Sequence, residues 1–163
     1  MIIRAVKEPI KILVCRRYGT TIRNTVFATF KEVLNKWKLT PFVKINESDF
    51  RIRFPNGSEI IFLGLDDEAK LLSLQGIGTI FVEEAYEVPQ NMVEQLNLRM
   101  RANVANQQLI LAWNPISRHS WLYDFSVVNP PASSVFIHST YKDNPFLSKE
   151  YVDALEELYV RNP

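Results

Sequence analysis

Short apolar runs alternate along this chain with stretches in which apolar residues recur at helical spacing. The runs cover residues 10–15, 78–85, 108–113 and 135–138. Runs this apolar, bounded by turn-forming residues, are typical of strands buried on both faces of a parallel sheet. Strands that alternate with helices predict a mainly parallel sheet with helices on both faces. We therefore predict an α/β fold with four core strands.

Each helical stretch is recognised by an apolar stripe or by a residue that favours the start of a helix. We expect the end of a helix over residues 1–7, and a longer helix that begins at Thr20 or Thr21 and buries a stripe extending to Trp37. Further helices are predicted over residues 66–74, from Pro89, over 121–128 and over 148–160.

The middle of the chain changes to a period of two. Phe50, Ile52 and Phe54 alternate with arginines, and a Pro-Asn-Gly turn follows at residues 55–57. This pattern predicts a β-hairpin whose second arm spans residues 58–63, with a third antiparallel strand over 42–45. We interpret the hairpin as an insertion or an extension at the edge of the sheet.

Composition limits the classes of protein. A chain of 163 residues with 47% apolar and 23% charged residues suits a single domain, here 1–163. The net charge of +1 gives no global signal for nucleic acid or membrane, so a nucleic-acid contact would need a local basic patch. Cys15 is the only cysteine, which excludes an internal disulfide, and no stretch has the length of a membrane span. We expect a soluble cytoplasmic protein.

Two adjacent carboxylates, Glu83 and Glu84, end the apolar run over residues 78–85. At the carboxyl end of a parallel strand, such a pair needs water, a cation or hydrogen-bond partners. A Mg²⁺ ion held through water by Glu83, with Glu84 orienting the attacking water, meets that need; this is a Walker B pattern. The alternative is that both residues merely open the next helix, where negative charge suits the helix dipole.

Asn114 ends the next apolar run and is a candidate sensor of phosphate at the same edge. The alternative is that Asn114-Pro115 only starts a turn. Lys70 is a candidate charge-stabilising finger for a neighbouring subunit, or else an ordinary solvated helix lysine. The sequence contains no G-x-x-x-x-G-K-[ST] loop to hold nucleotide phosphates between these groups.

Several motifs, in order, resemble the large terminase subunit of tailed bacteriophages of the PBSX type. The resemblance runs from about Ile10 to the carboxyl terminus and is carried by Arg16 with residues 21–27, by 54–67, 80–85 and 95–101, by 113–115 with 121–123, and by 138–147.

That family implies a RecA-like P-loop ATPase domain coupled to an RNase H-like nuclease domain, acting together on viral DNA. By position, Glu83 resembles the Walker B carboxylate, Glu84 the catalytic carboxylate and Asn114 the coupling residue. The family more often has a small hydroxyl residue where Ala112 or Trp113 stands. The resemblance places the Walker A loop before Met1 and the nuclease domain beyond residue 163, so we expect a sheet that lacks the Walker A strand and has an uncovered edge.

The resemblance implies ATP and Mg²⁺ as cofactors of the complete domain, with neither bound tightly by this chain alone. It implies double-stranded viral DNA, a portal protein, a small terminase subunit and further copies of the chain as partners, in the cytoplasm of a bacterial host. The candidate DNA or phosphate contacts are Arg16, Arg17, Arg23 and Lys70. Alternative interpretations are a non-catalytic α/β module that binds DNA or assembly proteins, with Arg51 and Arg53 as further basic candidates, and a fragment of a helicase-like motor.

Overall fold

The computed structural model describes residues 1–161 and, within that range, every side chain except that of Glu68. The chain divides into two compact units, Met1–Asp124 and Phe125–Pro163, and each is described by itself. The prediction of a single domain over 1–163 stays a prediction. Among residues 1–161, no helix combines the length and the apolar character that crossing a membrane requires.

A six-stranded sheet forms the centre of the first unit, in the order β2-β3-β4-β1-β5-β6. Strands β4, β1, β5 and β6 are parallel, and the hairpin strands β2 and β3 extend one edge with antiparallel pairing. The predicted fold class is confirmed. The strands are β1 (Lys11–Arg16), β2 (Lys44–Asn46), β3 (Arg51–Arg53), β4 (Glu59–Gly64), β5 (Ile77–Val82) and β6 (Gln108–Leu111).

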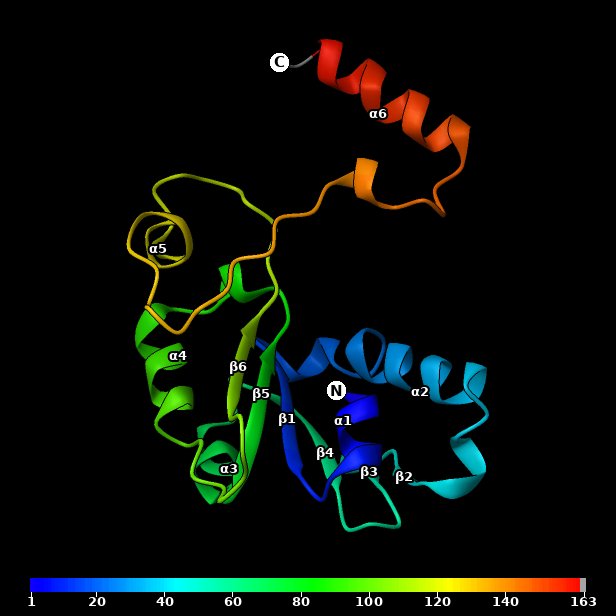
Figure 1. Ribbon diagram of the computed structural model, residues 1–163, viewed down its shortest axis with the longest axis vertical. Helices are drawn as coiled ribbons and strands as arrows, with labels where there is room; N and C mark the ends of the chain where they lie inside the picture. The colour runs from blue at the N-terminus through cyan, green and yellow to red at the C-terminus, as the bar shows by residue number, and fades with distance from the viewer. Residues whose placement is uncertain (162–163) are drawn as a thin grey trace. The chain divides into compact units, whose positions relative to one another are not determined.

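Helices cover both faces of this sheet (Figure 1). On one face, α1 and α2 pack against Ile12, Val14 and Phe62, while on the other, α3, α4 and α5 pack against Leu13 and Ile80. Adjacent residues of β1 therefore enter opposite cores, as expected for a strand buried on both faces. The helices are α1 (Ile2–Lys7), α2 (Val26–Lys36), α3 (Glu68–Ser73), α4 (Gln90–Asn97) and α5 (Trp121–Tyr123), which a π-helical segment (Asp124–Val128) follows.

The start and the end of α2 differ from the prediction. The hydroxyl of Thr21 donates to the Tyr18 carbonyl and that of Thr25 to the Thr21 carbonyl, so these side chains stabilise turns instead of capping a helix at Thr20 or Thr21. The helix consequently begins at Val26. Trp37, predicted on the buried stripe, follows the last residue of α2 and is 46% exposed.

Strand β5 contains a bulge at its amino end. Lys11 pairs with Ile77, but the next residue of β1 pairs with Thr79, so Gly78 is an extra residue. A Cβ atom on Gly78 would lie 2.8 Å from the Val104 Cγ2, so any residue other than glycine would require the surrounding atoms to move. The bulge reverses the alternation and places Ile77 in the same core as Ile80.

Two strand predictions are wrong in detail. Strand β6, predicted to be buried, is an edge strand, with Ile110 38% exposed. Residues 135–138 form no strand, and Val135 and Ile137 are 85% and 82% exposed. The fourth parallel strand is β4, the second arm of the hairpin, because β4 pairs with β1 in addition to β3.

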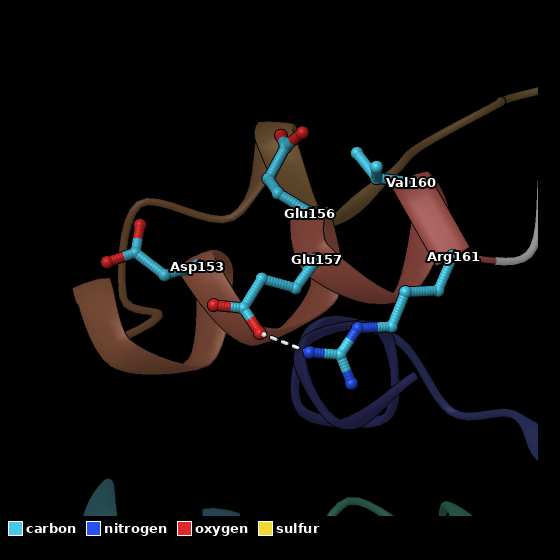
Figure 2. Close-up of a pocket in the computed structure, with 5 residues that line it drawn as sticks. All are labelled: Asp153, Glu156, Glu157, Val160 and Arg161. Carbon is cyan, nitrogen blue, oxygen red and sulfur yellow. Dashed lines mark ion pairs between the residues drawn. The ribbon is translucent and has the colours of Figure 1, made fainter.

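The second unit carries one long helix, α6 (Lys149–Arg161), close to the predicted range. Three carboxylates, Asp153, Glu156 and Glu157, project from it around a shallow hollow of about 490 Å³, and Glu157 pairs with Arg161 at 3.5 Å (Figure 2). No residue of α6 is buried, so the apolar face predicted for this helix lacks a core among the described residues.

Candidate functional site

The carboxyl ends of β1 and β5 bring Arg16 and Glu83 together. Cys15 pairs with Val82 in the parallel register, and the Glu83 N–H donates to the Cys15 carbonyl at 2.9 Å. The next residues on the two strands are therefore neighbours on one face of the sheet. The Arg16 Nε lies 3.2 Å from the Glu83 Oε2.

This ion pair offsets only part of the cost of burying the charged Glu83 carboxylate. The Oε2 of Glu83 and the Nε of Arg16 are buried atoms, and neither has a hydrogen-bond partner within the described residues. Burial raises the pKa of Glu83, the positive charge of Arg16 opposes the rise, and the charges of Glu84 and Glu87 add to it. A proton or a further cation therefore stabilises a carboxyl group in this environment.

Glu84 occupies the turn that follows β5. Its backbone has φ 52° and ψ 48°, the left-handed region that residues other than glycine, asparagine and aspartate rarely adopt. The turn is held because the Ala85 N–H donates to the Ala112 carbonyl at 2.9 Å and the Glu87 N–H donates to the Glu84 carbonyl at 3.0 Å. Such strain persists only where surrounding contacts maintain it, and it is frequent at functional sites.

Asn114 lies at the same edge of the sheet. Val82 pairs with Leu111 in the parallel register, and the Ala112 N–H donates to the Val82 carbonyl at 2.9 Å, so β6 ends beside β5. Asn114 follows two residues later and is exposed. The structure thus places the two carboxylates and the stretch before Asn114 together, while the roles of these residues remain predictions.

The other predicted phosphate or DNA contacts point elsewhere. Arg17 donates to the Met92 sulfur at 3.4 Å, and Arg23 lies 3.8 Å from the Glu47 carboxylate. Lys70 is an exposed residue of α3 and lies 3.0 Å from Asp67, three residues earlier. Of the candidates, only Arg16 reaches the carboxylates. Arg51 and Arg53 both pair with Glu59, at 3.2 and 2.9 Å.

The backbones of Gly64 and Gly19 approach each other closely next to the site, and the periodicity of the sequence does not predict this contact. A Cβ atom on Gly64, the last residue of β4, would lie 2.2 Å from the Gly19 nitrogen. The Gly19 N–H donates to the Asp66 carboxylate at 2.9 Å. This contact fixes the loop after β1, which contains Arg17, against the end of β4. The occurrence of glycine at both positions is the only clue that the sequence offers.

The carboxylates could form part of a site for Mg²⁺. Oxygen ligands suit this ion, which usually retains several waters and takes one or two carboxylates together with substrate phosphates. The buried Oε2 of Glu83, without a hydrogen bond, fits such a role. Among the described side chains, which do not include that of Glu68, no group of three or more from His, Cys, Asp or Glu is placed to hold a metal ion. The remaining ligands would therefore come from water and phosphate.

The sheet order and the helices on both faces define a RecA-like α/β fold. The family profile described as phage terminase large subunit matches residues 1–163. The chain belongs to this family.

Individual relatives agree with that assignment. The chain is 32% identical to the PBSX phage terminase large subunit of Bacillus subtilis (strain 168), with 100% of this chain and 42% of the relative aligned. It is 31% identical to the terminase large subunit of Bacillus phage SPP1, with 94% and 39% aligned. The chain thus spans about two-fifths of the length of these relatives. The large terminase of a thermophilic bacteriophage shares the fold, with a TM-score of 0.71 and 20% identity over 93% of this chain and 38% of that one.

Proposed function

We propose that this chain is the hydrolytic part of the ATP-driven motor domain of a terminase large subunit, which packages viral DNA into procapsids. Glu83 would hold Mg²⁺ through water, Glu84 would orient the attacking water, and Asn114 would couple hydrolysis to movement. The bound Mg²⁺ would neutralise charge on the ATP phosphates. The main support is the convergence of both carboxylates and the end of β6 at one edge of the sheet.

Two further observations support the proposal. The large terminase of the thermophilic bacteriophage, which has the same fold, has a structure in complex with ATP-γ-S. Glu83 also has the environment expected of a carboxylate that awaits a cation, since burial raises its pKa despite the adjacent Arg16. By analogy with the family, the partners would be double-stranded viral DNA, a portal protein, a small terminase subunit and further copies of the chain.

The 163 residues contain no G-x-x-x-x-G-K-[ST] loop. Tight binding of nucleotide phosphates needs successive backbone N–H groups and a lysine. We therefore expect the chain alone to show no appreciable ATP hydrolysis. In a version extended at its amino terminus by a segment carrying such a loop, Glu84→Gln should lower kcat at least about 100-fold while nucleotide affinity changes little.

Two results would contradict parts of this reasoning. Robust ATP turnover by the 163-residue chain that Glu84→Gln abolishes would contradict the expected need for a separate phosphate-binding loop, while leaving the role of Glu84 in place. An active extended version that is indifferent to Glu84→Gln would remove this carboxylate from the mechanism. The matched control is Glu94→Gln, an exposed glutamate of α4.

A non-catalytic module that binds DNA is the second candidate function, because the 163 residues contain no phosphate-binding loop. Such a module needs free cations, yet Arg16, Arg23, Arg51 and Arg53 each have a carboxylate within 4.0 Å. DNA affinity of the chain alone that falls steeply with salt, and falls further when Arg17 and Arg23 are changed to glutamate, would favour this function.

A further inference from the structure

A hollow of about 630 Å³ lies at the amino end of β5, between the ends of α3 and α4. It is lined in part by Gly76, which precedes the first residue of β5, whereas Glu83 follows the last residue. A six-residue strand separates the two positions by about 20 Å. The hollow is therefore distinct from the candidate hydrolytic site.

Two guanidinium groups line this hollow, those of Arg99 and Arg101, and none of its lining residues is acidic. The Arg99 Nε is buried and has no hydrogen-bond partner within the described residues, and an amino group of the same side chain reaches the Leu72 carbonyl only at 3.5 Å. Arg101 donates through Nε to the Leu98 carbonyl at 3.1 Å. The buried Arg99 Nε is closed to an outside acceptor, but a guanidinium group carries five N–H donors, and the other amino groups of Arg99 and Arg101 keep donors for one.

The surroundings reinforce the positive charge. The Lys11 ammonium donates to the Gln75 carbonyl at 2.9 Å and so lies beside the hollow. A ligand that complements this charge is anionic.

Apolar side chains narrow the class of ligand. Leu72 and Leu98 line the hollow and are 62% and 69% exposed. Exposed leucines gain nothing from DNA phosphates, which bind to cations and polar groups. Arginine donors beside an apolar surface are instead typical of protein–protein interfaces, where an apolar centre combines with charge-assisted hydrogen bonds.

We propose that this hollow is a docking site for an acidic, leucine-bearing amphipathic segment of another protein. A carboxylate of that segment accepts hydrogen bonds from Arg99 and Arg101, and its apolar side chains cover Leu72 and Leu98. The partner is defined by charge complementarity, since two guanidinium groups without an acidic neighbour in the hollow favour an anion, and by the two exposed leucines, which gain from an apolar neighbour.

The proposal is tested with a fluorescent helical peptide of about four turns, built from glutamate and leucine at amphipathic spacing. A matched peptide carries glutamine in place of every glutamate. Fluorescence anisotropy with the intact chain should show saturable binding of the acidic peptide, and binding at least about tenfold weaker of the glutamine peptide.

Variants then assign the binding to this surface. Arg99→Gln and Arg101→Gln should each weaken binding about tenfold, the loss expected for a charge-assisted hydrogen bond. The exposed pair Leu72→Ser and Leu98→Ser should together have a similar effect without unfolding the chain. Arg118→Gln is the control, because Arg118 is an exposed arginine outside the hollow.

Several results would overturn the proposal. These are no saturable binding of the acidic peptide, equal binding of the glutamine peptide, or peptide binding that is unchanged in the arginine and leucine variants. Competition by a short DNA duplex that depends on Arg99 and Arg101 but not on the leucines would assign the surface to nucleic acid instead. Self-association of the free chain that the same four substitutions abolish would assign it to a second copy.

Discussion

Replacing Arg16 by methionine would leave the Glu83 carboxylate partly buried without its adjacent cation. The side chains of Arg16 and Glu83 are 13% and 31% exposed, so this pair lies between a surface ion pair and a fully buried one. Surface pairs contribute about 0–1 kcal/mol, whereas breaking a buried pair costs about 3–5 kcal/mol. Because methionine keeps much of the apolar stem, we expect Arg16→Met to lower the free energy of unfolding by about 2 kcal/mol at neutral pH.

The pH dependence of this effect follows from the pKa of Glu83, which is raised in the folded protein. The folded state then takes up a proton more readily than the unfolded state. The stability linked to this carboxyl is fully present below its unfolded pKa and is lost as the pH rises through its folded pKa. Removing Arg16 raises the folded pKa of Glu83 further, so the cost of Arg16→Met should be small near about pH 4 and should grow toward neutral pH.

Urea denaturation at several pH values measures these free energies, and a double-mutant cycle with Glu83→Gln isolates the pairwise contribution. We expect Arg16→Met to cost less stability in the Glu83→Gln background, because no charged group then remains unpaired. The exposed Arg118→Met substitution is the control for loss of a positive charge. A cost of Arg16→Met below about 0.5 kcal/mol at neutral pH, together with no coupling in the cycle, would refute the reasoning.

Three further substitutions test the fold around the site. Arg4→Met removes hydrogen bonds to Thr79, Gln108 and a backbone carbonyl; we expect a loss of about 2–3 kcal/mol in urea denaturation, and an unchanged midpoint would contradict these contacts. Gly64→Ala should cost about 3 kcal/mol because its Cβ would lie 2.2 Å from a backbone nitrogen, whereas Gly19→Ala, with a nearest contact of 3.4 Å, should cost much less; equal costs would contradict the close contact. Burial of Glu59 favours its protonated form, but hydrogen bonds from two β3 arginines outweigh burial and lower the pKa of Glu59. The stability that the Glu59 carboxylate contributes is therefore present above its unfolded pKa and is lost as the pH falls through its lower folded pKa. Glu59→Gln should remove this contribution to acid sensitivity, and identical acid denaturation profiles of the two proteins would refute the prediction.

Local sequence patterns predict the strands of the parallel core because these strands are apolar throughout and also have neighbouring strands with which to pair. Strands β1 and β5 are continuous apolar runs, and both are buried between two helical layers. The hairpin is predictable from the alternation of β3 and from the Pro-Asn-Gly turn. What the pattern does not reveal is that β4 also pairs with β1, because a hairpin arm and a parallel strand can have the same apolar composition.

Residues 135–138 show the limit of the same reasoning. Their apolar character predicts a strand, yet a strand also needs a neighbour for its backbone hydrogen bonds. This segment is not part of the six-stranded sheet, and its side chains are exposed. In the part of the chain that the structure describes, strand β6 has a partner on one side only, which explains why Ile110 is partly exposed although the sequence predicts a buried strand.

The pairing of Arg16 with Glu83 depends on a single residue in the register of β5. Lys11 pairs with Ile77, and an uninterrupted ladder would carry this register forward and set Arg16 beside Val82. The extra residue at Gly78 shifts every later pair by one, so Arg16 meets the first carboxylate instead of an apolar side chain. Neither apolar periodicity nor motif spacing contains this shift, because both describe one strand at a time. The sequence could therefore identify the carboxylates, whereas the cation beside them followed only from the way two strands are aligned.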